Sequence, residues 1–267
     1  MTEWREQEAA NQARFVDVNE SMEMSRTTAY DVGGGSEDRS RDGSPGVEGA
    51  LVVTERAVAP TWRGRLHQAA FFAAIPAGGA LILVAHTVAA RVGASIYSVS
   101  LAGLYGTSAA YHRLDLSARF TRWMKRLDHS MIFVLIAGSY TPLALLVLHK
   151  PWSIVVLSVV WGGGLAGIAL KFIRIDGLSL LTGALYIVLG WMAVLIVPLL
   201  VRGMSAAALG LLFAGGLLYT GGAIVLARNR PDPRPLSFGY HEIWHSCVVG
   251  ASACHYLMIL LVTASAR

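Results

Sequence analysis

Two histidines stand four residues apart near the C-terminal end of the chain, in the stretch HEIWH from His241 to His245. As a pattern this is H-E-x-x-H, the signature of zinc metalloproteases, in which the histidines bind the metal and the glutamate acts as general base. On a helix, residues i and i+4 share a face and lie about 6 Å apart along the axis. The spacing therefore suits two ligands of one metal ion.

The residues after His245 do not complete a protease site. The long zincin pattern requires a glycine three residues and a histidine six residues after the second histidine, and those positions hold Val248 and Ala251. The other common class uses a downstream glutamate, and no glutamate follows Glu242. Glu242 itself should point about 100° away from the histidine face. We interpret it as an interface or helix N-terminal carboxylate, stabilised by the helix dipole and outside the metal site.

Composition indicates a membrane protein. The 267 residues are 54% hydrophobic and only 15% charged, whereas a soluble domain carries about 25% charged residues. Seven apolar stretches each approach the ~20 residues that span a bilayer. They cover residues 69–90, 94–112, 129–148, 152–170, 179–201, 205–227 and 240–262. We therefore predict an all-α, seven-transmembrane helix bundle in the cell membrane.

The first part of the chain is of a different kind. Residues 1–66 are rich in Glu, Asp, Arg, Ser and Gly and lack apolar periodicity, so we predict a disordered cytoplasmic tail followed by a membrane domain over 67–267. The net charge of +5 does not indicate nucleic-acid binding, because the basic residues fall between apolar segments, where membrane orientation explains them.

Lysine and arginine in the short loops predict the orientation. With the N-terminus inside, the inner loops carry ten basic residues and the outer loops three. The inner set is Arg113, Arg119, Arg122, Lys125, Arg126, Lys171, Arg174, Arg228, Arg230 and Arg234; the outer set is Arg91, Lys150 and Arg202. We expect a cytoplasmic N-terminus and an outer C-terminus.

This orientation brings polar residues from distant segments to one membrane level. The second stretch ends at His112, the third begins beside Asp128, and the seventh begins with His241 and His245, all on the cytoplasmic side. Three imidazoles suit zinc, and a catalytic site keeps its fourth position for water. Asp128 is either a fourth ligand or the group that holds and deprotonates the water. Ser108, four residues before His112, is placed to support the site by a hydrogen bond.

The remaining histidines and the two cysteines are expected to have structural roles. His255 shares the face of His241 but lies about 21 Å further along the helix, too far for the same metal. His86 is predicted within the first helix near its outer end and His149 in a turn, while His129 points away from the Asp128 face. Cys247 and Cys254 are expected to pack without pairing.

Four segments of the chain resemble the hemolysin III family. They are SAAYHR at 108–113, LDHSMIFVLIAGSYTPLALL at 127–146, ALYIVLGWMAV at 185–195 and FGYHEIWHSCVVGASACHYLMI at 238–259. Relatives of that family include the progestin and adipoQ receptors and, more distantly, the alkaline ceramidases. The resemblance implies zinc bound by His112, His241 and His245, with Asp128 reaching it directly or through water and Ser108 beside it.

The resemblance leaves three functions open. Ceramidase-like relatives imply a zinc-dependent hydrolase acting on a lipid amide or ester, with Asp128 as the base. The family name implies a cytolysin or pore-forming protein in which zinc is structural. A receptor or membrane-homeostasis role would use the same site without catalysis. Membrane lipids are the expected partners in each case.

Overall fold

The structure is a computed structural model that describes residues 60–173 and 179–266. The predicted tail lies outside the described residues as far as residue 59. Within the described ranges all named elements are helices, which confirms the all-α prediction. They are α2 (Arg65–Val84), α3 (Val88–Arg113), α4 (Ala118–Leu146), α5 (Trp152–Ile173), α6 (Ser179–Gly190), α7 (Met192–Leu195), α8 (Val197–Gly203), α9 (Ala206–Arg228) and α10 (Tyr240–Ser265).

The helices have the length and surface of membrane spans. Six of them are long and apolar enough to cross a bilayer, and a bent helical segment over 181–203 brings the number to seven if it counts as one span. Large apolar side chains remain exposed along the bundle, among them Leu83, Val99, Leu165 and Leu217. Such a surface would be costly in water and is stable in lipid. The chain is a multi-pass membrane protein.

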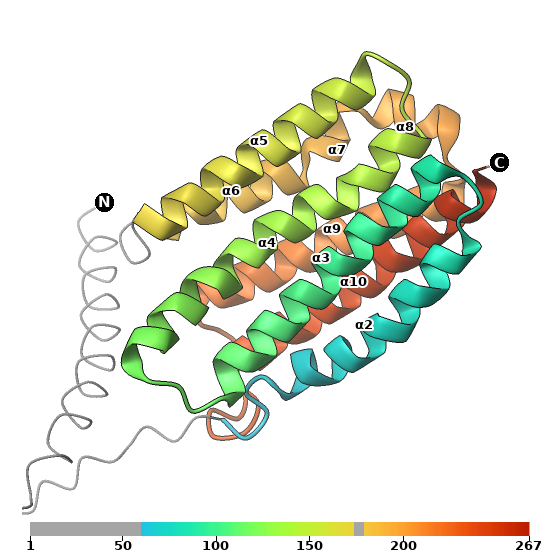
Figure 1. Ribbon diagram of the computed structural model, residues 1–267. Helices are drawn as coiled ribbons and strands as arrows, with labels where there is room; N and C mark the ends of the chain where they lie inside the picture. Colours follow the sequence, from blue (N-terminus) through green and yellow to red (C-terminus); the bar gives the residue numbers. More distant parts are fainter. Residues whose placement is uncertain (1–59, 174–178, 267) are drawn as a thin grey trace, which may run out of the picture. The chain divides into compact units, whose positions relative to one another are not determined.

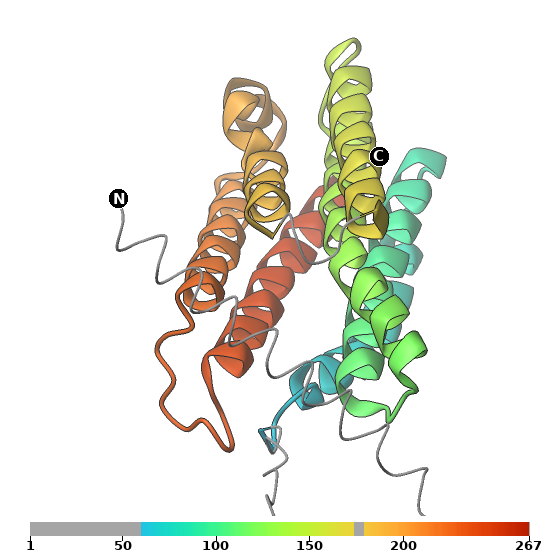
Figure 2. The same ribbon diagram turned by 90° about the vertical axis from the view of Figure 1, so that its left-hand side faces the viewer.

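Helix α10 lies at the centre of the bundle and packs against α9, α2, α4 and α3. The views in Figure 1 and Figure 2 agree that the start of α2, the end of α3, the start of α4 and the start of α10 lie at one end of the bundle. Because successive helices run in opposite directions, these four ends lie together. The sequence predicts this for the end of α3 and the starts of α4 and α10. Which side of the membrane this end faces remains a prediction.

Two predicted boundaries differ from the observed ones. Helix α4 begins at Ala118 rather than near His129, so Asp128 lies well inside the helix and not at its start. The additional turns carry Arg119, Arg122 and Lys125. Hydropathy places such a basic segment in a loop, because it is too polar to lie in lipid. The prediction that His86 lies within the first helix is wrong, since α2 ends at Val84 and His86 belongs to the connection to α3.

The fifth predicted span, 179–201, is interrupted. Helix α6 ends at Gly190, α7 forms a single turn, and the segment bends by 58° before α8. The Tyr140 hydroxyl of α4 accepts a hydrogen bond from Ala193 N and donates one to Gly190 O, both at 2.7 Å. A broken helix in lipid needs such partners, because each backbone N–H or C=O group without a hydrogen bond there raises the free energy of the fold by roughly several kcal/mol. Tyr140 therefore stabilises the break.

Candidate functional site

Three histidines meet at the shared end of the bundle. His112 comes from the last turn of α3, and His241 and His245 come from the first turns of α10. Each offers a ring nitrogen, and these nitrogens lie within 4.8 Å of one another. The Nε2 atoms of His112 and His241 are 3.3 Å apart. Two nitrogens bound tetrahedrally at about 2.0–2.1 Å from one ion are separated by about 3.3 Å. This pair therefore has the spacing of two metal ligands. The same separation also allows a hydrogen bond between the two rings.

The cluster is partly shielded from solvent. His245 is 6% exposed, and the other two rings are half-buried. The ring centroid of His245 lies 4.5 Å from that of His241 and 5.3 Å from that of His112. The three predicted histidines can therefore hold a metal ion, as the i,i+4 spacing on one helix and the alternating helix direction lead one to expect.

The two other predicted site residues, Asp128 and Ser108, contact each other. The buried Ser108 hydroxyl donates a hydrogen bond to the Asp128 carboxylate, so α3 and α4 are joined one turn away from His112. Among the described residues, the group of close ligand atoms consists of the three histidines and does not include Asp128.

Glu242 belongs to the frame of the site. Its carboxylate accepts a hydrogen bond from Gly239 N at 2.9 Å and so caps the first turn of α10. It also pairs with Arg63, whose Nε donates to Oε1 at 2.7 Å. The predicted helix N-terminal role is observed, and the side chain is buried in the protein, with 2% of its surface exposed. The ion pair ties the segment before α2 to the helix that carries two of the histidines.

The turn before α2 packs against the α9–α10 loop and against the end of α3 that carries His112. Backbone N–H groups of Thr61 and Trp62 donate to carbonyl oxygens of the α9–α10 loop at 3.2 Å. Gly64, at φ 74°, then lies so close to α3 that an added Cβ would come within 2.7 Å of the His112 Cβ. Only glycine combines this left-handed backbone with so close an approach. The turn therefore contributes to the position of the His112 side chain.

A fourth histidine lies at the same place and was missed in the sequence. His67, in the first turn of α2, is 4% exposed and stacks on His245 with ring centroids 3.8 Å apart and an interplanar angle of 4°. The alternation of helix directions that grouped the other polar residues also puts the start of the first helix at this end. That signal was available, but the predicted helix began at residue 69 and left His67 outside it.

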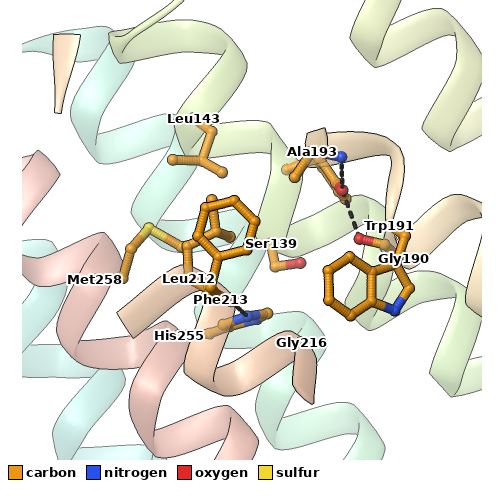
Figure 3. A pocket seen from close by; sticks show the side chains of 11 residues that line it. Ser139, Leu143, Gly190, Trp191, Ala193, Leu212, Phe213, Gly216, His255 and Met258 are labelled. Atoms are coloured by element: carbon orange, nitrogen blue, oxygen red, sulfur yellow. Dashed lines mark hydrogen bonds between the residues drawn. The ribbon is translucent and has the colours of Figure 1, made fainter. Parts of the chain in front are cut away.

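The other candidate groups lie apart from this cluster. His255 Nε2 is 3.3 Å from the Leu212 carbonyl oxygen, as its predicted structural role requires, and both cysteines are free. A small cavity of about 30 Å³ adjoins His255 at the break between α6 and α7 (Figure 3). It has room for about two water molecules. Ser139, Trp191 and Met258 also line it, and it is separate from the histidine cluster on α10.

Comparison with known proteins agrees with this architecture. The family model described as "Haemolysin-III related" matches residues 56–256. "Hemolysin-3 homolog" of Bacillus subtilis (strain 168) is 35% identical over 166 residues, which cover 62% of this chain and 75% of the relative. "Hemolysin-3" of Bacillus cereus is 32% identical over 185 residues, which cover 67% of this chain and 81% of the relative. The chain is thus a multi-pass membrane protein that belongs to the Haemolysin-III related family.

Proposed function

We propose that the protein is a zinc-dependent hydrolase that acts on an amide or ester bond of a membrane lipid. The observation that carries the proposal is the group of three histidine nitrogens within 4.8 Å at one end of a helix bundle. Three imidazoles with a nearby carboxylate are a donor set typical of catalytic zinc, which keeps a position open for water. The same residues are the ones that the family resemblance implies as the zinc site.

Each residue has a definite part in this proposal. His112, His241 and His245 would hold the ion, and zinc bound there would polarise a carbonyl group and lower the pKa of water toward about 7. Asp128 holds the attacking water by a hydrogen bond and accepts its proton. Ser108 donates its hydrogen bond to one carboxylate oxygen of Asp128, which orients the other oxygen for this task.

The position in the membrane supports a lipid as substrate. The cluster lies at the end of spans whose outer surfaces are apolar, which is the level expected for the headgroups of the surrounding lipids. The charges of the loops predict that this end faces the cytoplasm. The test is to place a protease-sensitive tag at each terminus and to measure which tag is cut in sealed membranes. A tag at the C-terminus that is cut from the cytoplasmic side would overturn the assigned orientation.

The experiment that tests the proposal has two measurements. The protein is purified into lipid nanodiscs, its zinc content is measured by elemental analysis, and turnover of ceramide and related lipid amides and esters is measured. We expect about one zinc per chain, with turnover abolished in Asp128→Ala and His241→Ala. Absence of zinc from the wild type would refute the site, and zinc without turnover of any of these lipids would refute the hydrolase.

Cytolysis is the second candidate, and the names of the relatives favour it. Both are called hemolysins, and in that case the zinc would be structural. The distribution of polar residues argues against a wide pore, because the buried ionisable side chains gather mainly at one end of the bundle. Leakage of dye from vesicles decides between the two: leakage that persists in Asp128→Ala favours cytolysis.

A further inference from the structure

His67 is a buried polar residue whose polar atoms lack partners. Its side chain is 4% exposed, and neither ring nitrogen meets hydrogen-bond geometry with any residue that the structure describes. The backbone of His245 lies close by, but without that geometry. Burial of an unsatisfied polar group is unfavourable. The ring therefore calls for a partner that arrives with a bound molecule or ion.

The neighbours of His67 hold the ring in one place. One face lies parallel to the His245 ring at 3.8 Å, and Tyr105 of α3 meets it edge-on at 5.1 Å between centroids. Tyr105 is itself 3% exposed. A buried ring in contact with two neighbouring rings has little freedom to turn toward a distant partner, so the missing partner must come to the histidine cluster.

The geometry separates His67 from the ligands. A ring stacked at 3.8 Å on a ligand ring has its nitrogens about 4–5 Å from an ion held by that ligand, which is beyond the 2.0–2.1 Å of a zinc–nitrogen bond. The same separation equals one metal–oxygen bond of about 2 Å followed by one hydrogen bond of about 2.8 Å. His67 is accordingly absent from the group of close ligand atoms.

We propose that His67 is a further binding residue of this site, which donates a hydrogen bond from a ring N–H to an oxygen atom of the ligand bound at the histidine cluster. This inference rests on the proposed function and names the ligand chemistry: an oxygen that carries partial negative charge, such as a carbonyl, carboxylate or hydroxamate oxygen. Stacking on His245 fixes the direction of the donor.

The test uses cobalt in place of zinc, because its visible absorption reports on bound ligands, and acetohydroxamate as an oxygen-donor probe. The wild type, His67→Phe, His67→Asn and His67→Gln are loaded with cobalt in nanodiscs and titrated. Phenylalanine keeps the stacked ring and loses the donor. We expect one cobalt per chain in His67→Phe, acetohydroxamate affinity about 10-fold lower than in the wild type, and partial recovery in whichever amide variant matches the donating nitrogen.

His255→Phe is the matched control, because it makes the same change elsewhere on α10, and we expect its affinity to equal that of the wild type. Equal affinity in His67→Phe and the wild type would overturn the inference while leaving the zinc proposal intact. An equal loss in His255→Phe, or recovery in neither amide variant, would overturn it as well. A wild type that binds neither zinc nor cobalt would overturn both proposals.

Discussion

Two regions along α10 contain buried or half-buried histidines, and they differ in the hydrogen-bond partners of the ring nitrogens. Near the middle of the helix, His255 has a backbone carbonyl within 3.3 Å and sits beside the small cavity of Figure 3. At the start of the helix, His241 and His245 face His112, and His67 has no partner among the described residues. The same residue type therefore has a backbone partner in one region and mostly other histidines as neighbours in the other.

The difference shows how burial relates to function in this bundle. A histidine that pairs with a carbonyl stabilises helix packing and needs nothing further. Where histidines are mostly surrounded by other histidines, a cation is the best partner, because one ring nitrogen of each histidine can donate its lone pair to the same ion. Burial alone would rank His255 and His241 alike, since both are half-buried, whereas the identity of the partner atoms separates them.

Loss of a ligand should have the largest effect. We expect His245→Ala to abolish zinc binding and any zinc-dependent turnover, because two nitrogens remain where three are needed. His255→Ala should still bind one zinc per chain. Elemental analysis of the two purified variants provides the measurement, and equal zinc content in both would remove the distinction between the two regions.

Loss of the carboxylate should leave the metal and remove the reaction. Asp128→Asn keeps the shape of the side chain but cannot accept a proton, so we expect turnover to fall about 10²–10⁴-fold with zinc content unchanged. If zinc is lost together with turnover, Asp128 is a direct ligand. Ser108→Ala serves as a milder companion, since it removes only the hydrogen bond to this carboxylate.

The frame of the histidine cluster should contribute to stability. In Glu242→Ala the α10 cap is lost and Arg63 loses the carboxylate with which it pairs, and we expect the free energy of unfolding to fall by about 1–3 kcal/mol. Thermal unfolding in detergent measures the change. Zinc content should remain at one per chain, because Glu242 contributes no ligand; a variant that unfolds normally but lacks zinc would give Glu242 a role in the site itself.

The smallest effect is expected at the helix break near the cavity. Tyr140→Phe removes the hydroxyl that bonds both Gly190 and Ala193, and we expect a loss of about 1–2 kcal/mol with unchanged zinc content. Tyr256→Phe is the matched control, because its hydroxyl donates a hydrogen bond to the Ala77 carbonyl, within the continuous helix α2. Equal melting temperatures for the two variants would show that the break does not depend on Tyr140.

Hydropathy predicted the number and order of the apolar segments well, because the energetic cost of polar residues in lipid restricts the composition of each span. It predicted helix ends poorly where a helix continues beyond the apolar segment, as α4 does at Ala118. It also missed the break after Gly190, since the hydroxyl that makes the break tolerable belongs to Tyr140, fifty residues earlier.

The sequence by itself determined four of the residues that lie at one end of the bundle. Span length and alternating direction are properties of the chain alone, and they grouped His112, Asp128, His241 and His245 before any contact was known. Only the tertiary structure decided which of the buried polar atoms are already satisfied. Hydrogen-bond partners come from helices that are distant in sequence. How those helices pack therefore decides that His255 has a carbonyl oxygen nearby and that His67 has no hydrogen-bond partner among the described residues.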